Sequence, residues 1–223
     1  MNAWLEVVLV SLVLTNLVVL GSSRLASCIR VVAIQGTILG ALPLLVHAHD
    51  ITVRTIALSV GSFALKGVAF PWLLFRALRD SDARREVEPL IGYTVSILWG
   101  VLSLAIAFWL ASRLTLPCPA PTPLLIPAAF STIFIGLFLI VSRRKAITQV
   151  LGYLVLENGI YAFGVALATE EPWLVEMGVL LDVFVAVFVM GIMIFHISRE
   201  FDHIDVDRLA SLKDWTRRWR RAP

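Results

Sequence analysis

Long apolar runs recur along the whole sequence, and they constrain its fold more than any other feature. Hydrocarbon about 30 Å thick is crossed by roughly 20 helical residues, and seven runs reach about that length. They cover residues 2–20, 27–46, 55–78, 90–111, 124–142, 147–168 and 174–197. The chain is 59% hydrophobic and 16% charged, whereas about a quarter of the residues in soluble domains are charged. The sequence therefore predicts an all-α polytopic membrane protein with seven transmembrane helices.

Basic residues are distributed unevenly between the connections that join these runs. The connections after the first, third and fifth runs, together with the tail, contain Arg24, Arg30, Arg76, Arg79, Arg84, Arg85, Arg143, Arg144, Lys145 and the arginines from Arg199 onward. The alternate connections contain only Arg54 and Arg113. Because basic connections stay in the cytoplasm, we expect the N-terminus outside and the C-terminus inside. The first run lacks the basic flank and cleavage site of a signal peptide, so we expect it to be retained.

Proline marks the one clear division of the chain. Residues 116–123, "LPCPAPTP", cannot continue a helix and predict a proline-rich outer connection. It separates a four-helix N-terminal part, residues 1–115, from a three-helix part, residues 124–197. The tail, residues 198–223, places its large apolar residues on one helical face, opposite charged positions. We expect an amphipathic, basic cytoplasmic helix that lies at the lipid headgroups or docks on a cytoplasmic partner.

Cysteine and histidine do not form a metal or haem site in the sequence. Cys28 and Cys118 fall on opposite sides of the membrane in the predicted topology, so a disulfide between them is excluded. The sequence has no CxxC motif and no Cys/His cluster at metal-ligand spacing. We therefore expect neither a metal nor another cofactor in this chain.

Glu157 is the most informative polar residue, because it lies near the middle of the sixth run. Tyr153 and Tyr161 lie one helical turn to either side of it, and Gly152 and Gly159 allow another helix to approach closely. An ionisable residue at mid-membrane costs about 2.5–3.5 kcal/mol and commonly marks an ion or proton pathway. We interpret Glu157 as a residue that loads and releases a proton. The alternative is a protonated glutamate that only forms a structural hydrogen bond.

Three further ionisable residues lie within the apolar runs. Asp182 is in the seventh run beside small residues, and Glu176 lies near the outer boundary of the same run. Lys66 is in the middle of the third run, and Pro71 predicts a disturbed helix just after it. We expect Lys66 to belong to a proton path or an ion pair, with a partner that could lie in another subunit. Glu157, Asp182, Lys66, Tyr153, Tyr161 and Glu176 are the candidate proton-path residues.

The segment "RRKAITQVLGYLVLENGIYAFG", residues 143–164, resembles the 4L/K-type subunit of respiratory complex I. In that three-helix subunit, a basic connection precedes a helix with a central glutamate, and the next helix brings a second membrane acid. The four additional N-terminal helices, which include "LKGVAFPWLL", make the whole chain similar to component E of hydrogenase-4. By this resemblance, Glu157 matches the mid-helix glutamate and Lys66 matches an intramembrane lysine. Asp182 matches the second acid approximately, since the family more often has glutamate there.

The resemblance implies a non-catalytic membrane-arm subunit of a complex I-like oxidoreductase in the inner (plasma) membrane of a prokaryote. The relatives belong to energy-converting nickel–iron hydrogenases and formate hydrogenlyase-like complexes. The chain would lie between the subunit that anchors the redox arm and the antiporter-like subunits, and its buried acids would contribute to proton translocation. Nickel–iron centres, iron–sulfur clusters or quinone would belong to partner subunits, and nucleic acid is not an expected partner.

Two other interpretations stay open at this point. The chain could be a free-standing secondary cation or proton transporter, which would need a substrate cavity and broken helices. It could also be a structural scaffold whose buried charges hold helices together, since such pairs are often replaceable by apolar residues.

Overall fold

The computed structural model describes residues 2–46, 53–80, 91–114, 122–143 and 145–167. All of them lie in the first of two compact units, residues 1–186, and the second unit, residues 187–223, lies outside the described part. The described residues form helices joined by short turns, with no strand among them. The predicted all-α architecture is therefore confirmed for this part of the chain.

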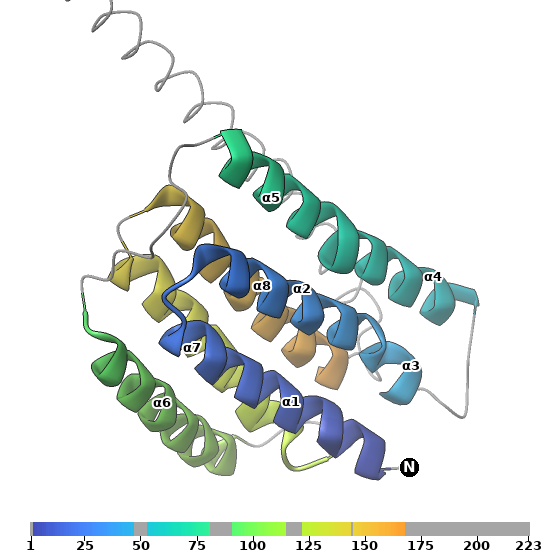
Figure 1. The fold of residues 1–223 in the computed structure, drawn as a ribbon. Helices are drawn as coiled ribbons and strands as arrows, with labels where there is room; N and C mark the ends of the chain where they lie inside the picture. Colours follow the sequence, from blue (N-terminus) through green and yellow to red (C-terminus); the bar gives the residue numbers. More distant parts are fainter. Residues whose placement is uncertain (1, 47–52, 81–90, 115–121, 144, 168–223) are drawn as a thin grey trace, which may run out of the picture. The chain divides into compact units, whose positions relative to one another are not determined.

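The helices follow the apolar runs closely (Figure 1). Their bounds are α1 Asn2–Gly21, α2 Leu25–Gly40, α3 Leu42–Val46, α4 Val53–Ser62, a π-helix Phe63–Ala69, α5 Phe70–Asp80, α6 Tyr93–Arg113, α7 Leu125–Ser142 and α8 Ala146–Leu167. The α2–α3 pair forms one apolar segment, and α4, the π-helix and α5 follow one another without a break. Within the described residues, five segments are long and apolar enough to cross a membrane, Ala3–Gly21, Leu25–Val46, Thr55–Arg76, Tyr93–Arg113 and Leu125–Ser142.

The sixth predicted span coincides with α8, which has the required length of 22 residues. This helix contains the polar residues Gln149, Glu157 and Asn158. The seventh predicted span and the amphipathic tail lie outside the described residues. The count of seven spans and their orientation therefore stay predictions.

The α7 and α8 helices pack together, α1, α2, α3 and α6 contact this pair, and the α4–α5 segment lies against α2 (Figure 1). The closest contact joins α7 to α8, and α1 packs against α2, α6 and α7. The α2 helix contacts α8 on one side and the π-helix with α5 on the other. As a result, the lysine-bearing segment and the glutamate-bearing helix both lie against α2.

Glycine allows the tight contact between α7 and α8. A Cβ atom added to Gly159 would lie 2.7 Å from the amide nitrogen of Ile133, and one added to Gly152 would lie 2.8 Å from that of Ile140. Gly136 of α7 makes an equally close approach to the backbone of Leu156. The close approach predicted for Gly152 and Gly159 is confirmed, and the neighbouring helix is α7.

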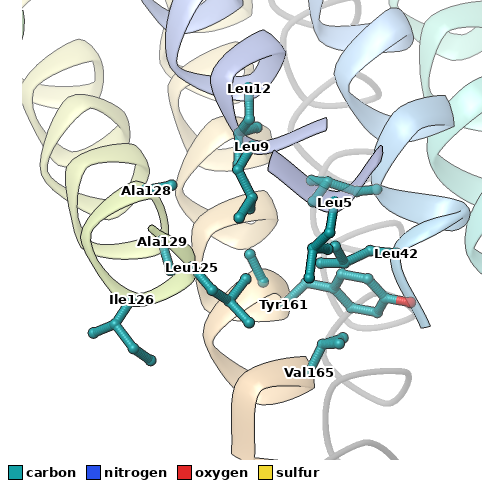
Figure 2. Packing of buried hydrophobic residues seen from close by; sticks show 12 residues of the cluster. Leu5, Leu9, Leu12, Leu42, Leu125, Ile126, Ala128, Ala129, Tyr161 and Val165 are labelled. Carbon is teal, nitrogen blue, oxygen red and sulfur yellow. The ribbon is translucent and has the colours of Figure 1, made fainter. Parts of the chain in front are cut away.

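An apolar cluster packs where α1, α3, α7 and α8 meet (Figure 2). It contains Leu5, Leu9, Leu12, Leu39, Leu42, Leu125, Ile126, Ala128, Ala129, Tyr161, Ala162 and Val165. Figure 2 shows the ring of Tyr161 beside Leu42 and Leu5. This cluster fixes the position of the tyrosine ring one turn beyond Glu157.

Arg143 joins several helix ends, although the sequence indicated only a charge in a connection. Its side chain is 1% exposed, and its Nη2 donates a hydrogen bond to the carbonyl oxygen of Leu20, at the end of α1, at 3.1 Å. The guanidinium carbon lies 5.6 Å from the ring centroid of Tyr93, at the start of α6. Burial lowers the pKa of Arg143 from its usual value, but the side chain stays positively charged because arginine loses its proton only at very high pH.

Candidate functional site: a buried lysine–glutamate pair

Lys66 lies in the π-helix, where the regular α-helical hydrogen-bond pattern is interrupted. In a π-helix each amide bonds to the carbonyl five residues earlier, and the amide of Phe70 donates to the carbonyl of Leu65 in this way. The next residue, Pro71, has no amide hydrogen to donate. The disturbed helix predicted from Pro71 is therefore present, as a wide turn that includes Lys66.

Gly36 of α2 provides the space beside this turn. A Cβ atom on Gly36 would lie 2.5 Å from the Cβ of Lys66 and 2.9 Å from its carbonyl carbon and oxygen. Any larger residue at this position would displace the lysine backbone. The glycine therefore sets how closely α2 and the π-helix approach one another.

Lys66 and Glu157 form an ion pair inside the helix bundle. The Nζ atom of Lys66 lies 2.9 Å from Oε1 of Glu157, and the two side chains are 3% and 2% exposed. The expected partner of Lys66 is therefore found in the same chain. The second carboxylate oxygen, Oε2 of Glu157, is buried and has no hydrogen-bond partner among the described residues. One oxygen is thus occupied by the ammonium group, and the other is open to a proton or a water molecule.

Tyr161 forms a third side of the site. The Nζ atom of Lys66 lies 4.4 Å from the centroid of its ring, within the range of a favourable cation–π contact. The tyrosine thus positions the ammonium group beside Glu157. Tyr153, on the preceding turn, is only partly buried.

A small cavity lies next to the ion pair. Its volume is about 10 Å³, which is near the lower limit for holding one water molecule. It is lined by Ile29, Val32, Lys66, Phe70, Pro71, Leu74, Leu154 and Asn158. Lys66 and Asn158 supply its polar groups, and Asn158 is 2% exposed. Sequence reasoning did not select Asn158, although an asparagine directly after a mid-membrane glutamate was a usable signal.

A second buried polar cluster connects α1, α2 and α7, and sequence reasoning missed it. Nε2 of Gln35 donates to Oδ1 of Asn16 at 2.7 Å, and Nδ2 of Asn16 donates to Oγ1 of Thr132 at 2.8 Å. Thr132 in turn donates to the carbonyl oxygen of Ala128. No residue of this cluster is ionisable, so the cluster fixes the helices to one another and does not hold a charge.

The remaining sequence predictions for the site lie outside the described residues. These are Asp182 and Glu176. Among the residues that the structure does describe, no group of three or more histidine, cysteine, aspartate or glutamate side chains is arranged to hold a metal ion.

The C-terminal part of the chain matches a known protein family. Residues 124–214 match the family described as NADH-ubiquinone/plastoquinone oxidoreductase chain 4L. This region includes α7, α8 and the glutamate of the ion pair, whereas Lys66 lies outside it. No solved structure matches the chain.

Relatives extend the similarity beyond this region. The chain is 35% identical over 204 residues to an uncharacterized protein, Rv0085, of Mycobacterium tuberculosis, which covers 91% of this chain and 93% of that protein. It is 28% identical over 155 residues to hydrogenase-4 component E of Escherichia coli K12, covering 70% of this chain and 72% of the relative. Hydrogenase-4 component E of Shigella flexneri matches to the same extent. The chain therefore belongs to the same family as Rv0085, and it is similar to hydrogenase-4 component E over most of its length and to the complex I chain 4L family in its C-terminal part.

Proposed function

We propose that this chain is a non-catalytic membrane-arm subunit of a complex I-like oxidoreductase, and that the Lys66–Glu157 pair is a proton-handling site within it. The comparisons support the first part, because the chain is similar to chain 4L of NADH-ubiquinone/plastoquinone oxidoreductase and to component E of hydrogenase-4. The observation that carries the second part is the ion pair of 2.9 Å between two buried side chains, one of which, Lys66, lies in a segment long and apolar enough to cross a membrane.

The geometry of the pair suits reversible protonation. The ammonium group and the carboxylate of the pair balance one another while both are charged. A proton that binds Oε2 of Glu157 neutralises the carboxylate and removes the negative charge beside the ammonium group. The free energy of the protonated pair then changes with any change of charge nearby, because electrostatic interactions are strong where water is scarce.

Charge changes of this kind would come from partner subunits. Redox chemistry in the arm of the complex would alter the charge or hydration beside the pair, and the displaced proton would move toward antiporter-like subunits. Asp182 would continue the path on the next helix. Nickel–iron centres, iron–sulfur clusters or quinone would be held by the partners in this proposal, and the complex would lie in the inner membrane of a prokaryote.

The test is the replacement Glu157→Gln in the assembled complex. Glutamine keeps the size of the side chain but neither carries a negative charge nor exchanges a proton. We expect the partner subunits to co-purify at wild-type levels, while redox-driven proton translocation in membrane vesicles is lost. Exposed Glu6, a carboxylate near the start of α1, gives the matched control as Glu6→Gln, which should leave translocation unchanged. Wild-type assembly together with wild-type translocation in Glu157→Gln would refute the proton-handling role.

A further inference from the structure

One face of α4 leads directly to the ion pair and contains only polar residues. At 100° per residue, Thr55, Ser59 and Ser62 fall within a narrow arc of α4, and Lys66 follows four residues later in the π-helix. All four are buried, at 8%, 5%, 3% and 3% exposure. Ile56 and Val60, on other sides of the same helix, are apolar and exposed. A helix that faced only lipid and apolar neighbours would have no reason to bury this face.

The buried hydroxyl groups of the described residues are of two kinds: some donate to a carbonyl oxygen of their own helix, and others, which include Ser131 and Ser142 as well as two on this face, have no hydrogen-bond partner among the described residues. A serine or threonine inside a helix commonly donates to the carbonyl oxygen three or four residues earlier. Ser103 and Thr132 do so here, at 2.7 Å each. The Oγ atoms of Ser59 and Ser62 are buried but have no hydrogen-bond partner among the described residues. A buried hydroxyl left without a partner costs about 1–3 kcal/mol, so these two groups call for a small hydrogen-bonding ligand.

The spacing of the face suits water as that ligand. Residues three or four apart on a helix lie about 5–6 Å apart along and around its axis. One water molecule bridges two hydroxyl groups at this separation, because each of its hydrogen bonds spans about 2.8 Å. A file of waters from Thr55 to Lys66 would extend along about 16 Å of helix. It would end at the ammonium group, beside the open oxygen of Glu157.

We propose that Thr55, Ser59 and Ser62 line a file of ordered water along the buried face of α4, which connects the Val53 end of the helix with the Lys66–Glu157 pair. This inference rests on the proposed function, because it supplies the route by which protons reach or leave the pair. An excess proton moves along such a file as O–H bonds break and form between neighbouring waters, and each water keeps two protons after it has passed. In the predicted topology, the Val53 end of the helix faces the outside of the membrane.

Cysteine accessibility tests this water file without requiring turnover. Single cysteines would replace Ser59 or Ser62 in a complex whose natural Cys28 and Cys118 have been replaced by alanine. Membrane fragments that expose both faces of the membrane to solvent are treated with Ag⁺. The protein is then denatured, and the thiols that have not reacted with Ag⁺ are labelled and counted. Thiols react as thiolates, which form in contact with water and are suppressed in apolar surroundings. Ser59→Cys and Ser62→Cys should therefore react at least about tenfold faster than a cysteine facing lipid, since one unit of thiol pKa changes the thiolate fraction about tenfold.

Two controls lie on the same helix. Val53→Cys, at a position that is 84% exposed at the end of α4, should react fast, and Val60→Cys, on the apolar face between the two serines, should react slowly. Co-purification of the partner subunits shows that each variant is assembled. The water file is refuted if both serine positions react as slowly as Val60→Cys while Val53→Cys reacts.

The outcome is separable from that of the Glu157→Gln experiment. Slow reaction with Ag⁺ at both serine positions would refute the water file along α4 but would not contradict the proton-handling role of Glu157. Normal translocation in Glu157→Gln would remove that role, whereas fast labelling would still show water beside α4.

Discussion

At the scale of single residues, the pairing of Lys66 with Glu157 offsets the free-energy cost of placing each charge within the membrane. Either side chain at mid-membrane costs about 2.5–3.5 kcal/mol. The pair places the two charges 2.9 Å apart, and Tyr161 adds a favourable contact with the ammonium group. Replacing one partner of such a pair lowers the stability strongly, because a single buried charge remains. Replacing both partners by apolar residues lowers it much less.

This asymmetry predicts the result of a double-mutant cycle. Lys66→Met and Glu157→Leu should each lower the free energy of unfolding by about 3–5 kcal/mol, while the double variant should lose much less than the sum. Denaturant unfolding of the purified protein in detergent measures the three values. Additive losses would show that the two charges do not interact. A stable double variant that has lost proton translocation would distinguish a functional pair from a scaffold, which would keep its activity.

At the scale of helices, glycines determine which helices approach closely and therefore where the polar side chains meet. Gly159 and Gly152 bring the glutamate-bearing helix against α7, and Gly36 brings α2 against the backbone of Lys66. Each contact is with backbone atoms, which cannot move aside as a flexible side chain would. Gly164, on the same helix α8, has no such neighbour within 4 Å of an added Cβ.

The two glycines of α8 predict opposite effects for one substitution. Gly159→Ala should lower the free energy of unfolding by about 1–3 kcal/mol, because its methyl group would overlap the backbone of α7. Gly164→Ala should be neutral or raise it by up to about 1 kcal/mol, since alanine favours the helix and meets no clash. Thermal unfolding of the two variants side by side measures the difference. Equal effects would contradict the close packing of α7 and α8.

At the scale of the whole molecule, polar contacts connect the helices at more than one position along the helix bundle. Arg143 connects the end of α1 with the start of α6, and the Asn16–Gln35–Thr132 cluster joins α1, α2 and α7. Hydrogen bonds between membrane helices contribute about 0.6 kcal/mol each on average. Their main effect here is to hold the helices in one register, so that the ion pair forms.

The predicted orientation has a direct test in a bacterial host. The basic connections place Arg143 on the cytoplasmic side and Arg113 on the outer side. Alkaline phosphatase, which folds only outside the cytoplasm, should be active when fused after Arg113 and inactive when fused after Ser142. Measured activities in the reverse order would invert the topology, and with it the side from which the α4 water file opens.

Several features of this protein follow from the sequence alone. Hydropathy is a property of short segments, so the ends of α1 to α8 lie within a few residues of the predicted runs. The isolated charges Glu157 and Lys66 are likewise visible without a fold, because any ionisable residue within a long apolar run requires an explanation. The sequence motif around Glu157 also indicated the similarity to complex I chain 4L and to hydrogenase-4 component E that the comparisons show.

The tertiary structure decided how these pieces meet. Lys66 and Glu157 are far apart in the chain, and only the packing of both segments against α2 brings them together. The π-helix around Lys66, the cavity beside Asn158 and the buried hydroxyls of α4 depend on the same packing. Sequence patterns show which face of a helix is polar. Which helix packs against that face is decided by close contacts between helices that are far apart in the sequence.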